Sequence, residues 1–327
     1  MKQIILVSLA LMLVLFLFPL AVMPDEPLLS GLALVETDEL DDGDSEHTSD
    51  YIVPFAEDSG TPPPEPEETL SFDANTYVTV IVNDEMTELS LKDYLRGVMA
   101  GEVPASFPEE ALKAQAVAAR TYIMRNPAAT FIDDPSTCMA YSDKYDPRLD
   151  AAVENTDGEV LMYDGEPILA VFFSTSSGKT ENAADVWGGE YPYLVAVDSI
   201  GEDDSPGRHA SITVDLSDFW AALDGVAPSE TPFGTVARTP SGGVSSIEIS
   251  GVEVKGTELR ALFGLNSTNF TVAIINGKVV FETVGYGHGV GMPQYGACAM
   301  ALEGAGYEEI LRHYYTGAEM AKLSPVS

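Results

Sequence analysis

The chain has 327 residues, 52 of them acidic and 16 basic, which gives a formal net charge of −36 at pH 7. A charge of this sign and size excludes nucleic acid as a partner, because the phosphate backbone would repel it. The length allows one large domain or two small ones. The two cysteines are too few for a disulfide framework.

The first 73 residues divide into two segments of different composition. Residues 4–23 form an uncharged, strongly apolar run of about the length that spans a bilayer, and no small-x-small cleavage site is obvious after it. We therefore expect residues 1–23 to be a signal anchor of a single-pass membrane protein with its body outside the cytoplasm; a cleaved signal peptide is the alternative. Residues 24–73 hold 16 acidic residues and no Lys or Arg. This composition predicts an extended, disordered linker to a folded domain at 74–327.

The first helix predicted in the folded part carries a glutamate on its apolar face. Apolar residues at i, i+4 and i+7 mark that face: Leu91, Leu95 and Val98. Glu102 continues the series, just before Pro104 ends the helix. A desolvated carboxyl keeps its proton to higher pH, which is how a general acid is made. The alternative is a glutamate at a frayed helix end that turns back into solvent, and the spacing leaves both interpretations open.

A second helix is predicted to begin close to Glu102. Residues 106–109 match a capping box with a proline in the first turn, and the helix should end before Pro127. Lys113 and Arg120 lie seven residues apart and so share a face of this helix. A local basic groove around these two residues would offset the negative charge of the folded part and receive a polar or anionic ligand. A high counter-ion concentration is the alternative, and the sequence does not say which applies.

The sequence predicts neither a metal site nor a cofactor. Cys138 follows Asp133 and Asp134 with no histidine nearby, whereas zinc requires about four well-placed ligands, chiefly nitrogen or sulfur. Nothing in the sequence argues for a bridge between Cys138 and Cys298, and the pairing is left open.

The middle of the chain predicts short strands and short helices. An apolar, strand-like run at 168–173 precedes a Ser/Thr-rich stretch. Alternation predicts strands at 212–214, 244–249 and 272–275, and two short segments read as helices, 218–223 and 256–263. Together with the two earlier helices, this pattern predicts an α+β domain that is helical at its N-terminal end and strand-rich in the middle.

Two groups of polar residues are candidates for ligand contacts. Ser176 or Ser177 with His288 would suggest a serine hydrolase, but the spacing shows no nucleophile elbow, so we expect the hydroxyls to bind substrate instead. His288 stands among four glycines in residues 285–292, a density that lets the backbone approach a ligand closely. Its ring can bind a ligand, orient Glu102 or cap backbone groups of a tight loop. Two residues that follow offer an amide and an aromatic surface, or form the first turn of a helix: Gln294 and Tyr295.

Two long blocks of the sequence resemble the signatures of the stage II sporulation protein D family. The first runs from Gly97-Val-Met-Ala-Gly-Glu-Val-Pro to Tyr122, and the second is Gly285-Tyr-Gly-His-Gly-Val-Gly-Met-Pro-Gln-Tyr-Gly-Ala297. With the tail at 307–317, the resemblance covers about residues 76–320. It implies a lytic transglycosylase that cuts peptidoglycan glycan strands already stripped of stem peptides, during engulfment in endospore formers. The family's catalytic glutamate falls on Glu102.

The resemblance also implies partners and leaves two alternatives. The implied partners are peptidoglycan glycan strands, a cell-wall amidase and a membrane scaffold protein. Similar domains enhance an amidase, so a non-catalytic role is the first alternative. A conventional glycoside hydrolase is the second; it requires a second carboxylate, for which Glu181 and Asp185 are candidates. Given the resemblance, the further substrate-binding candidates are Lys113, Arg120, Ser177, His288, Gln294 and Tyr295.

Overall fold

The computed structural model describes residues 33–34, 70–82, 84–132 and 138–325. The predicted anchor at 1–23 and most of the predicted linker lie outside these residues. None of the helices in the described ranges has the length and apolar character needed to cross a membrane.

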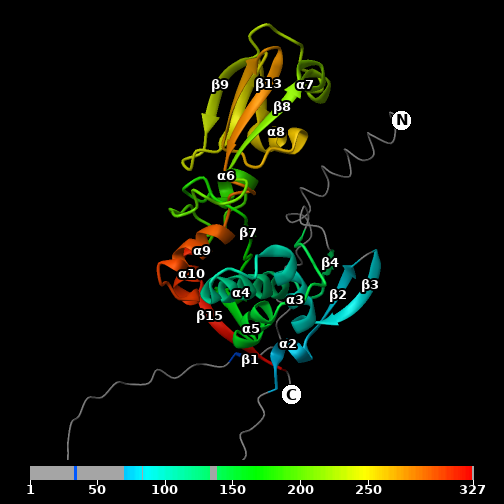
Figure 1. The fold of residues 1–327 in the computed structure, drawn as a ribbon, viewed down its shortest axis with the longest axis vertical. Coiled ribbons are helices and arrows are strands. Elements are labelled where there is room, and N and C mark those ends of the chain that lie inside the picture. Colours follow the sequence, from blue (N-terminus) through cyan, green and yellow to red (C-terminus); the bar gives the residue numbers. More distant parts are fainter. Residues whose placement is uncertain (1–32, 35–69, 83, 133–137, 326–327) are drawn as a thin grey trace, which may run out of the picture.

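The lower part of the molecule in Figure 1 is a helical body built from both ends of the chain. Its centre is α4 (Glu109–Arg125), which packs against α3 (Leu91–Glu102) and α5 (Pro147–Asn155). From the C-terminal end, α9 (Gln294–Leu302) and α10 (Tyr307–Tyr314) pack on the same helix. The alanines of α4 are buried, and their small side chains let neighbouring backbones approach closely.

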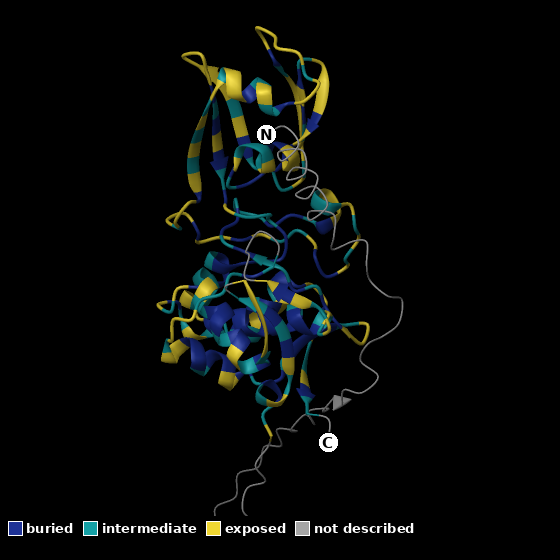
Figure 2. Cartoon of the chain, turned by 90° about the vertical axis from the view of Figure 1, so that its right-hand side faces the viewer, coloured by how far each residue is buried: buried dark blue, intermediate teal, exposed yellow. Residues whose placement is uncertain are grey.

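Two small sheets complete the helical body. One has the order β1-β15-β5-β6, with antiparallel pairing throughout, and its strands are Ala33–Leu34, Glu319–Ser324, Glu159–Tyr163 and Glu166–Pro167. The other has the order β3-β2-β4, in which β2 pairs antiparallel with β3 and parallel with β4; its strands are Glu85–Ser90, Tyr77–Val82 and Thr130–Ile132. Figure 2 shows that most of the buried residues of this body lie between its helices and sheets.

The upper part of the molecule is a β lobe formed by residues 209–284 (Figure 1). One sheet has the order β12-β13-β8, with strands Phe270–Ile275, Lys278–Val284 and His209–Asp215. The other has the order β11-β10-β9, with strands Val252–Lys255, Val244–Ile249 and Phe233–Arg238. The lobe also contains two short helices, α7 (Leu216–Ala222) and α8 (Gly256–Phe263). Aromatic rings, Phe219 and Phe281 among them, fill its separate core.

Two segments distant in sequence join the helical body to the β lobe. Strand β7 (Phe172–Phe173) pairs in parallel with β14 (Met292–Pro293). An isolated bridge between Thr175 and Tyr286 continues the contact toward the lobe, and α6 (Ala183–Trp187) lies in the same layer. The two sequence blocks near residues 100 and 290 are therefore brought together beneath the lobe.

The structure confirms the predicted α+β content and most of the predicted elements. Both long helices, the three short strands and the two short helices are present at the expected places. Two predictions were wrong in detail. The N-cap of α4 is Pro108, and it makes no side-chain capping bond, so the capping box at 106–109 does not form. The apolar run at 168–173 pairs as a strand only at its last two residues.

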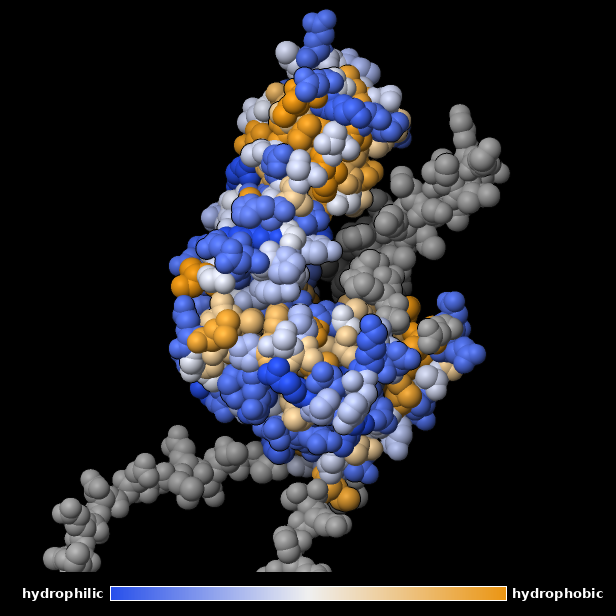
Figure 3. All heavy atoms as spheres, in the orientation of Figure 1, coloured by the Kyte–Doolittle hydropathy of each residue, from blue (hydrophilic) through white to orange (hydrophobic). Residues whose placement is uncertain are grey.

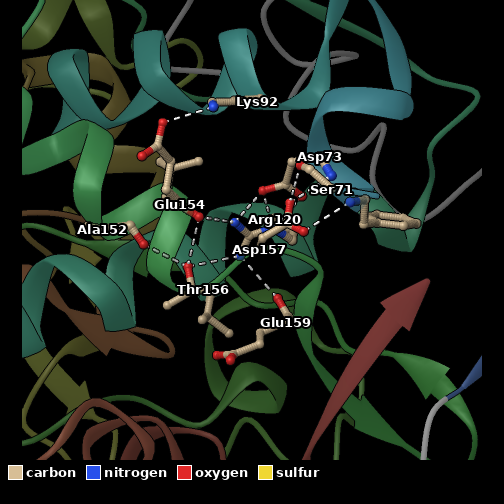
Figure 4. Close-up of polar contacts among 12 residues, drawn as sticks. Ser71, Asp73, Lys92, Arg120, Ala152, Glu154, Thr156, Asp157 and Glu159 are labelled. Carbon is tan, nitrogen blue, oxygen red and sulfur yellow. Dashed lines mark hydrogen bonds and ion pairs between the residues drawn. The ribbon is translucent and has the colours of Figure 1, made fainter. Parts of the chain in front are cut away.

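The folded part begins earlier than the predicted linker boundary at residue 73. Helix α2 (Phe72–Asn75) is capped by Ser71, and the side chain of Asp73 is buried. Figure 4 shows this segment, in which Asp73 meets Arg120 and the backbone near Ser71 meets Asp157. The acidic composition of residues 24–73 hid this contact, because one of its 16 acidic residues is an internal ion-pair partner rather than a solvated charge.

Candidate active site

Glu102 is the last residue of α3, at the end of the buried stripe that its sequence predicts. Leu91, Leu95 and Val98 are fully buried, and Glu102 is half-buried where the next residue leaves the helix. The interpretation of Glu102 as a residue turned fully into solvent is therefore wrong. Burial raises the pKa of its carboxyl above the usual range, because loss of hydration destabilises the charged form more than the neutral form.

Both oxygens of the Glu102 carboxyl accept a hydrogen bond. The backbone N–H of Ala140 donates to Oε1 over 2.7 Å, and Nε2 of Gln294 donates to Oε2 over 3.0 Å. These two donors stabilise the charged form and so act against burial, which is the larger effect on the pKa. The carboxyl is thus held in a fixed orientation while its affinity for a proton is raised.

Two glycines on one face of α3 allow this arrangement. Ser142 donates its backbone N–H to the carbonyl of Gly97 over 3.0 Å, so the chain after residue 138 runs directly against the helix. A Cβ on Gly97 would come within 2.0 Å of the ring of Tyr141. A Cβ on Gly101 would come within 2.6 Å of the backbone of Ala140. The close approach delivers the Ala140 N–H to Glu102.

The Glu102 carboxyl lies in a cleft of about 450 Å³ between the helical body and the connecting layer. Two tyrosines, Tyr286 and Tyr295, offer aromatic surface to a ligand, and Ser174 offers a hydroxyl. Surfaces of this kind suit a sugar, whose apolar face stacks on aromatic rings while its hydroxyls hydrogen-bond. The described residues that line the cleft are Ala100, Gly101, Glu102, Val103, Pro104, Ser174, Pro206, Tyr286, Gln294 and Tyr295.

A guanidinium group fixes the loop that follows Glu102. Arg148, at the start of α5, donates to the carbonyls of Ala105 and Phe107, the latter over 2.7 Å. The ring of Phe107 meets Tyr295 edge to face, with the centroids 5.1 Å apart. Arg148 therefore supports one wall of the cleft from behind and does not line the cleft itself.

Gln294 and Tyr295 are the predicted site residues that the structure brings together with Glu102. They form the first turn of α9, as one interpretation of the sequence expected, and they also line the cleft, as the other expected. Gln294 is 7% exposed, so its amide is committed to Glu102 rather than to solvent.

His288 and Ser177 lie apart from Glu102, on a second cavity of only about 20 Å³. Nδ1 of His288 accepts the Val290 N–H over 3.1 Å, so Nε2 carries the proton and donates to the carbonyl of Phe172 over 3.0 Å. Burial lowers the pKa of His288 to about 4, which keeps the ring neutral near pH 7. The ring caps backbone groups of a tight loop, and the idea that it orients Glu102 was wrong.

Lys113 and Arg120 do not form the predicted basic groove. Lys113 pairs with Glu109 and Glu110 on its own helix. Arg120 is fully buried and pairs with Asp73 over 2.6 Å, so it cannot contact a substrate. Among the described residues, the cleft has no Lys or Arg in its lining.

The structure does not bring together the residues that a serine hydrolase or a two-carboxylate glycoside hydrolase would need. The hydroxyl of Ser176 donates to Glu202 over 2.6 Å and not to His288. Glu181 lines the small cavity, where its Oε1 accepts from Thr239 and from the backbone N–H of Gly243. Of the described carboxylates, Glu102 alone lines the large cleft, since neither Glu181 nor Asp185 reaches it.

Several groups at the site were not singled out from the sequence. The Ala140 N–H has no sequence signature, because any residue but proline supplies a backbone donor. Tyr286 is 46% exposed at the cleft, and its position between two glycines could have drawn attention to it.

Cys138 and Cys298, whose pairing the sequence left open, are both free thiols. The pKa of Cys138 is raised by burial and by the nearby Glu102 charge.

Comparison with known proteins gives a consistent set of relatives. The family model described as stage II sporulation protein matches residues 82–163. The chain is 36% identical over 263 residues to "Stage II sporulation protein D" of Bacillus subtilis (strain 168), which covers 73% of this chain and 77% of that protein. It is also 36% identical to the protein of that name from Bacillus amyloliquefaciens, with 73% and 76% covered. An "Amidase enhancer" of Bacillus subtilis (strain 168) is 31% identical over 281 residues, 69% of this chain and 40% of that protein.

Proposed function

The chain belongs to the stage II sporulation protein D family, and from this premise we propose that it is a lytic transglycosylase with Glu102 as its catalytic acid and base. Its substrate is a peptidoglycan glycan strand from which the stem peptides have been removed. The observation that carries the proposal is the half-buried carboxyl of Glu102, held by two hydrogen bonds in an open cleft.

The proposed reaction needs a single carboxyl. Protonated Glu102 gives its proton to the glycosidic oxygen as the bond to C1 breaks, so the leaving sugar departs as an alcohol. The resulting Glu102 carboxylate then takes the proton of the C6 hydroxyl as that oxygen bonds to C1 and closes a 1,6-anhydro ring. The carboxyl ends as it began, and no water is consumed.

The lining of the cleft supports this chemistry over hydrolysis. A hydrolase requires a second carboxylate, either to activate water or to form a covalent intermediate. Glu102 is the only carboxylate in the lining among the described residues. The raised pKa of Glu102 supports its role as the acid, since a carboxyl with an ordinary pKa would be ionised at neutral pH.

The cellular setting is part of the same proposal. The apolar residues 4–23 would hold the domain at the membrane, on the side that faces the wall. There it would act in engulfment together with a cell-wall amidase and a membrane scaffold protein.

A second candidate function has its own support. The 31% identity to a protein named "Amidase enhancer" favours a domain that presents glycan to an amidase without cutting it.

The test is mass spectrometry of the soluble products from purified glycan strands, with and without stem peptides. We expect the full-length chain to release fragments with 1,6-anhydro ends, chiefly from peptide-free strands. Glu102→Gln keeps the shape of the side chain and should lower the rate by about 10²–10⁴-fold. Glu253→Gln, an exposed glutamate of β11, is the matched control. Fragments heavier by one water would show hydrolysis, and binding without release would favour the amidase-enhancer function.

A further inference from the structure

The groups around the Glu102 carboxyl decide which of its oxygens can carry a proton. Oε1 faces the backbone N–H of Ala140, at 2.7 Å from the nitrogen. A backbone N–H can only donate, so Oε1 must be an acceptor in both protonation states. The proton therefore belongs on Oε2, the oxygen that faces Gln294.

A glutamine amide differs from a backbone N–H because it carries a donor and an acceptor on one group. In the structure, Nε2 of Gln294 donates to Oε2, which fits the ionised carboxyl. Rotation of the amide by half a turn would present its carbonyl oxygen instead, which fits a protonated Oε2. The backbone of Gln294 is held meanwhile, because it begins α9 directly after Pro293 in β14.

We propose that Gln294 is a positioning residue, which keeps the transferable proton of Glu102 on Oε2 and matches both protonation states by rotating its amide. The proposal rests on the proposed function, in which one carboxyl acts first as an acid and then as a base. A partner with a fixed donor would favour only the base, and one with a fixed acceptor only the acid. This role differs from the sugar contact that the sequence predicts for Gln294.

Two kinds of titratable group lie near Glu102, a cysteine thiol and tyrosine hydroxyls, and a substitution of Gln294 leaves them in place. Cys138, on the segment that carries Ala140, has a half-buried thiol whose pKa is raised by burial. Tyr295 of α9 and Tyr286 of the glycine-rich loop line the same cleft. The described lining has no Lys or Arg, so no cation there would take over from the amide.

The substitution Gln294→Met tests the proposal, because methionine has a similar shape and neither donates nor accepts strongly. We expect the pKa of Glu102 to rise by about half a unit to one unit, because the ionised carboxyl loses a charge-assisted hydrogen bond, which is stronger than the neutral bond that the protonated carboxyl loses. The kcat for strand cleavage should fall about tenfold or more, with KM nearly unchanged. The pKa is read by ¹³C NMR of carboxyl-labelled glutamate in the full-length chain, with Glu102→Gln to assign the signal.

The matched control is Gln115→Met in α4. Gln115 is another buried glutamine, and its two amide atoms have no hydrogen-bond partner. This control should leave the Glu102 pKa and kcat unchanged. A second variant, Gln294→Glu, keeps the polar group in case the first does not fold. It should couple the two carboxyls, so that the higher of the pair's two apparent pKa values rises above the pKa of Glu102 in the wild type.

An unchanged Glu102 pKa in both Gln294 variants would overturn the proposal. A raised KM with unchanged kcat would do so as well, because it would show that Gln294 holds the sugar. The titration does not depend on catalysis. If the wild type makes no anhydro ends but Gln294→Met still shifts the pKa, the proposed reaction fails while the assignment of the proton to Oε2 stands.

Discussion

Gly101 and Ala140 touch so closely that a Cβ on Gly101 would lie 2.6 Å from the carbonyl carbon of Ala140. The residue after Gly101 is part of the same arrangement, because Glu102 accepts the hydrogen bond that the backbone N–H of Ala140 donates. The glycine therefore sets the distance at which the Glu102 carboxyl meets its backbone donor.

Gly101→Ala should push the segment at 139–141 away from α3 and break the bond to Glu102. We expect strand cleavage to fall by about tenfold to a hundredfold, since a displaced general acid loses alignment with the bond it protonates. Gly306→Ala is the control, because its Cβ would meet its nearest neighbour at an ordinary 3.7 Å and its φ is −74°. Equal activity of the two variants, measured by release of anhydro ends, would contradict the assigned role of Gly101.

The raised pKa of Glu102 should make the stability of the fold depend on pH. The folded state binds this proton more tightly than the unfolded chain, whose value is near 4.5. The stabilisation is therefore complete below that value and is lost as pH rises through the higher pKa of the folded state. Urea unfolding between pH 4 and 8 should show that Glu102→Gln gains free energy of unfolding relative to wild type as the pH rises. Parallel curves would show that the pKa is not raised.

Asp73→Ala should destabilise the domain strongly, because it leaves the buried Arg120 charge without its partner. Removal of one member of a buried ion pair costs roughly 3–5 kcal/mol. The control is Asp224→Ala, an exposed aspartate of the β lobe. Chemical denaturation of both variants measures the difference, and Asp73→Ala with Arg120→Met should recover part of the loss. A loss below about 1 kcal/mol would mean that Arg120 finds another partner.

Strand cleavage should become faster as salt is raised from low ionic strength. Peptide-free strands carry a lactyl carboxylate on alternate sugars, the chain carries −36, and the described lining of the cleft has no Lys or Arg. Raising the salt from about 0.01 M to about 0.15 M shortens the screening length from about 30 Å to about 8 Å, which weakens this repulsion. The measurement is kcat/KM against ionic strength, with binding of a neutral N-acetylglucosamine oligomer as the control. A rate that falls with salt would show that cations recognise the strand.

The surface of the helical body is largely hydrophilic on the face shown in Figure 3. Figure 3 shows hydrophilic residues over much of the helical body on the face in view, with apolar residues in small groups there and a broader apolar area on the β lobe. The sequence suggested a basic groove at Lys113 and Arg120 to receive the strand. Both cations are instead used within the protein.

The parts of the site that the sequence predicted are those with local signatures. The place of Glu102 on α3 follows from helix periodicity and a terminating proline, and both operate over a few residues. The partner of Arg120 could not be predicted in this way, because Asp73 lies 47 residues away and looked like one more linker charge. The bond from Gln294 to Glu102 spans 192 residues. Helix α4 packs against both α3, which carries Glu102, and α9, which carries Gln294, and this tertiary packing brings the two side chains together.

The order of the chain also decides when the cleft can exist. One wall comes from residues 100–104 and the other from residues 286–295, with the whole β lobe between them in sequence. During synthesis Glu102 therefore emerges long before Gln294, which orients its carboxyl. A chain interrupted anywhere before Gln294 carries Glu102 but not the amide that holds it. The hydrogen bond that orients the Glu102 carboxyl therefore cannot form until nearly all of the chain has been made.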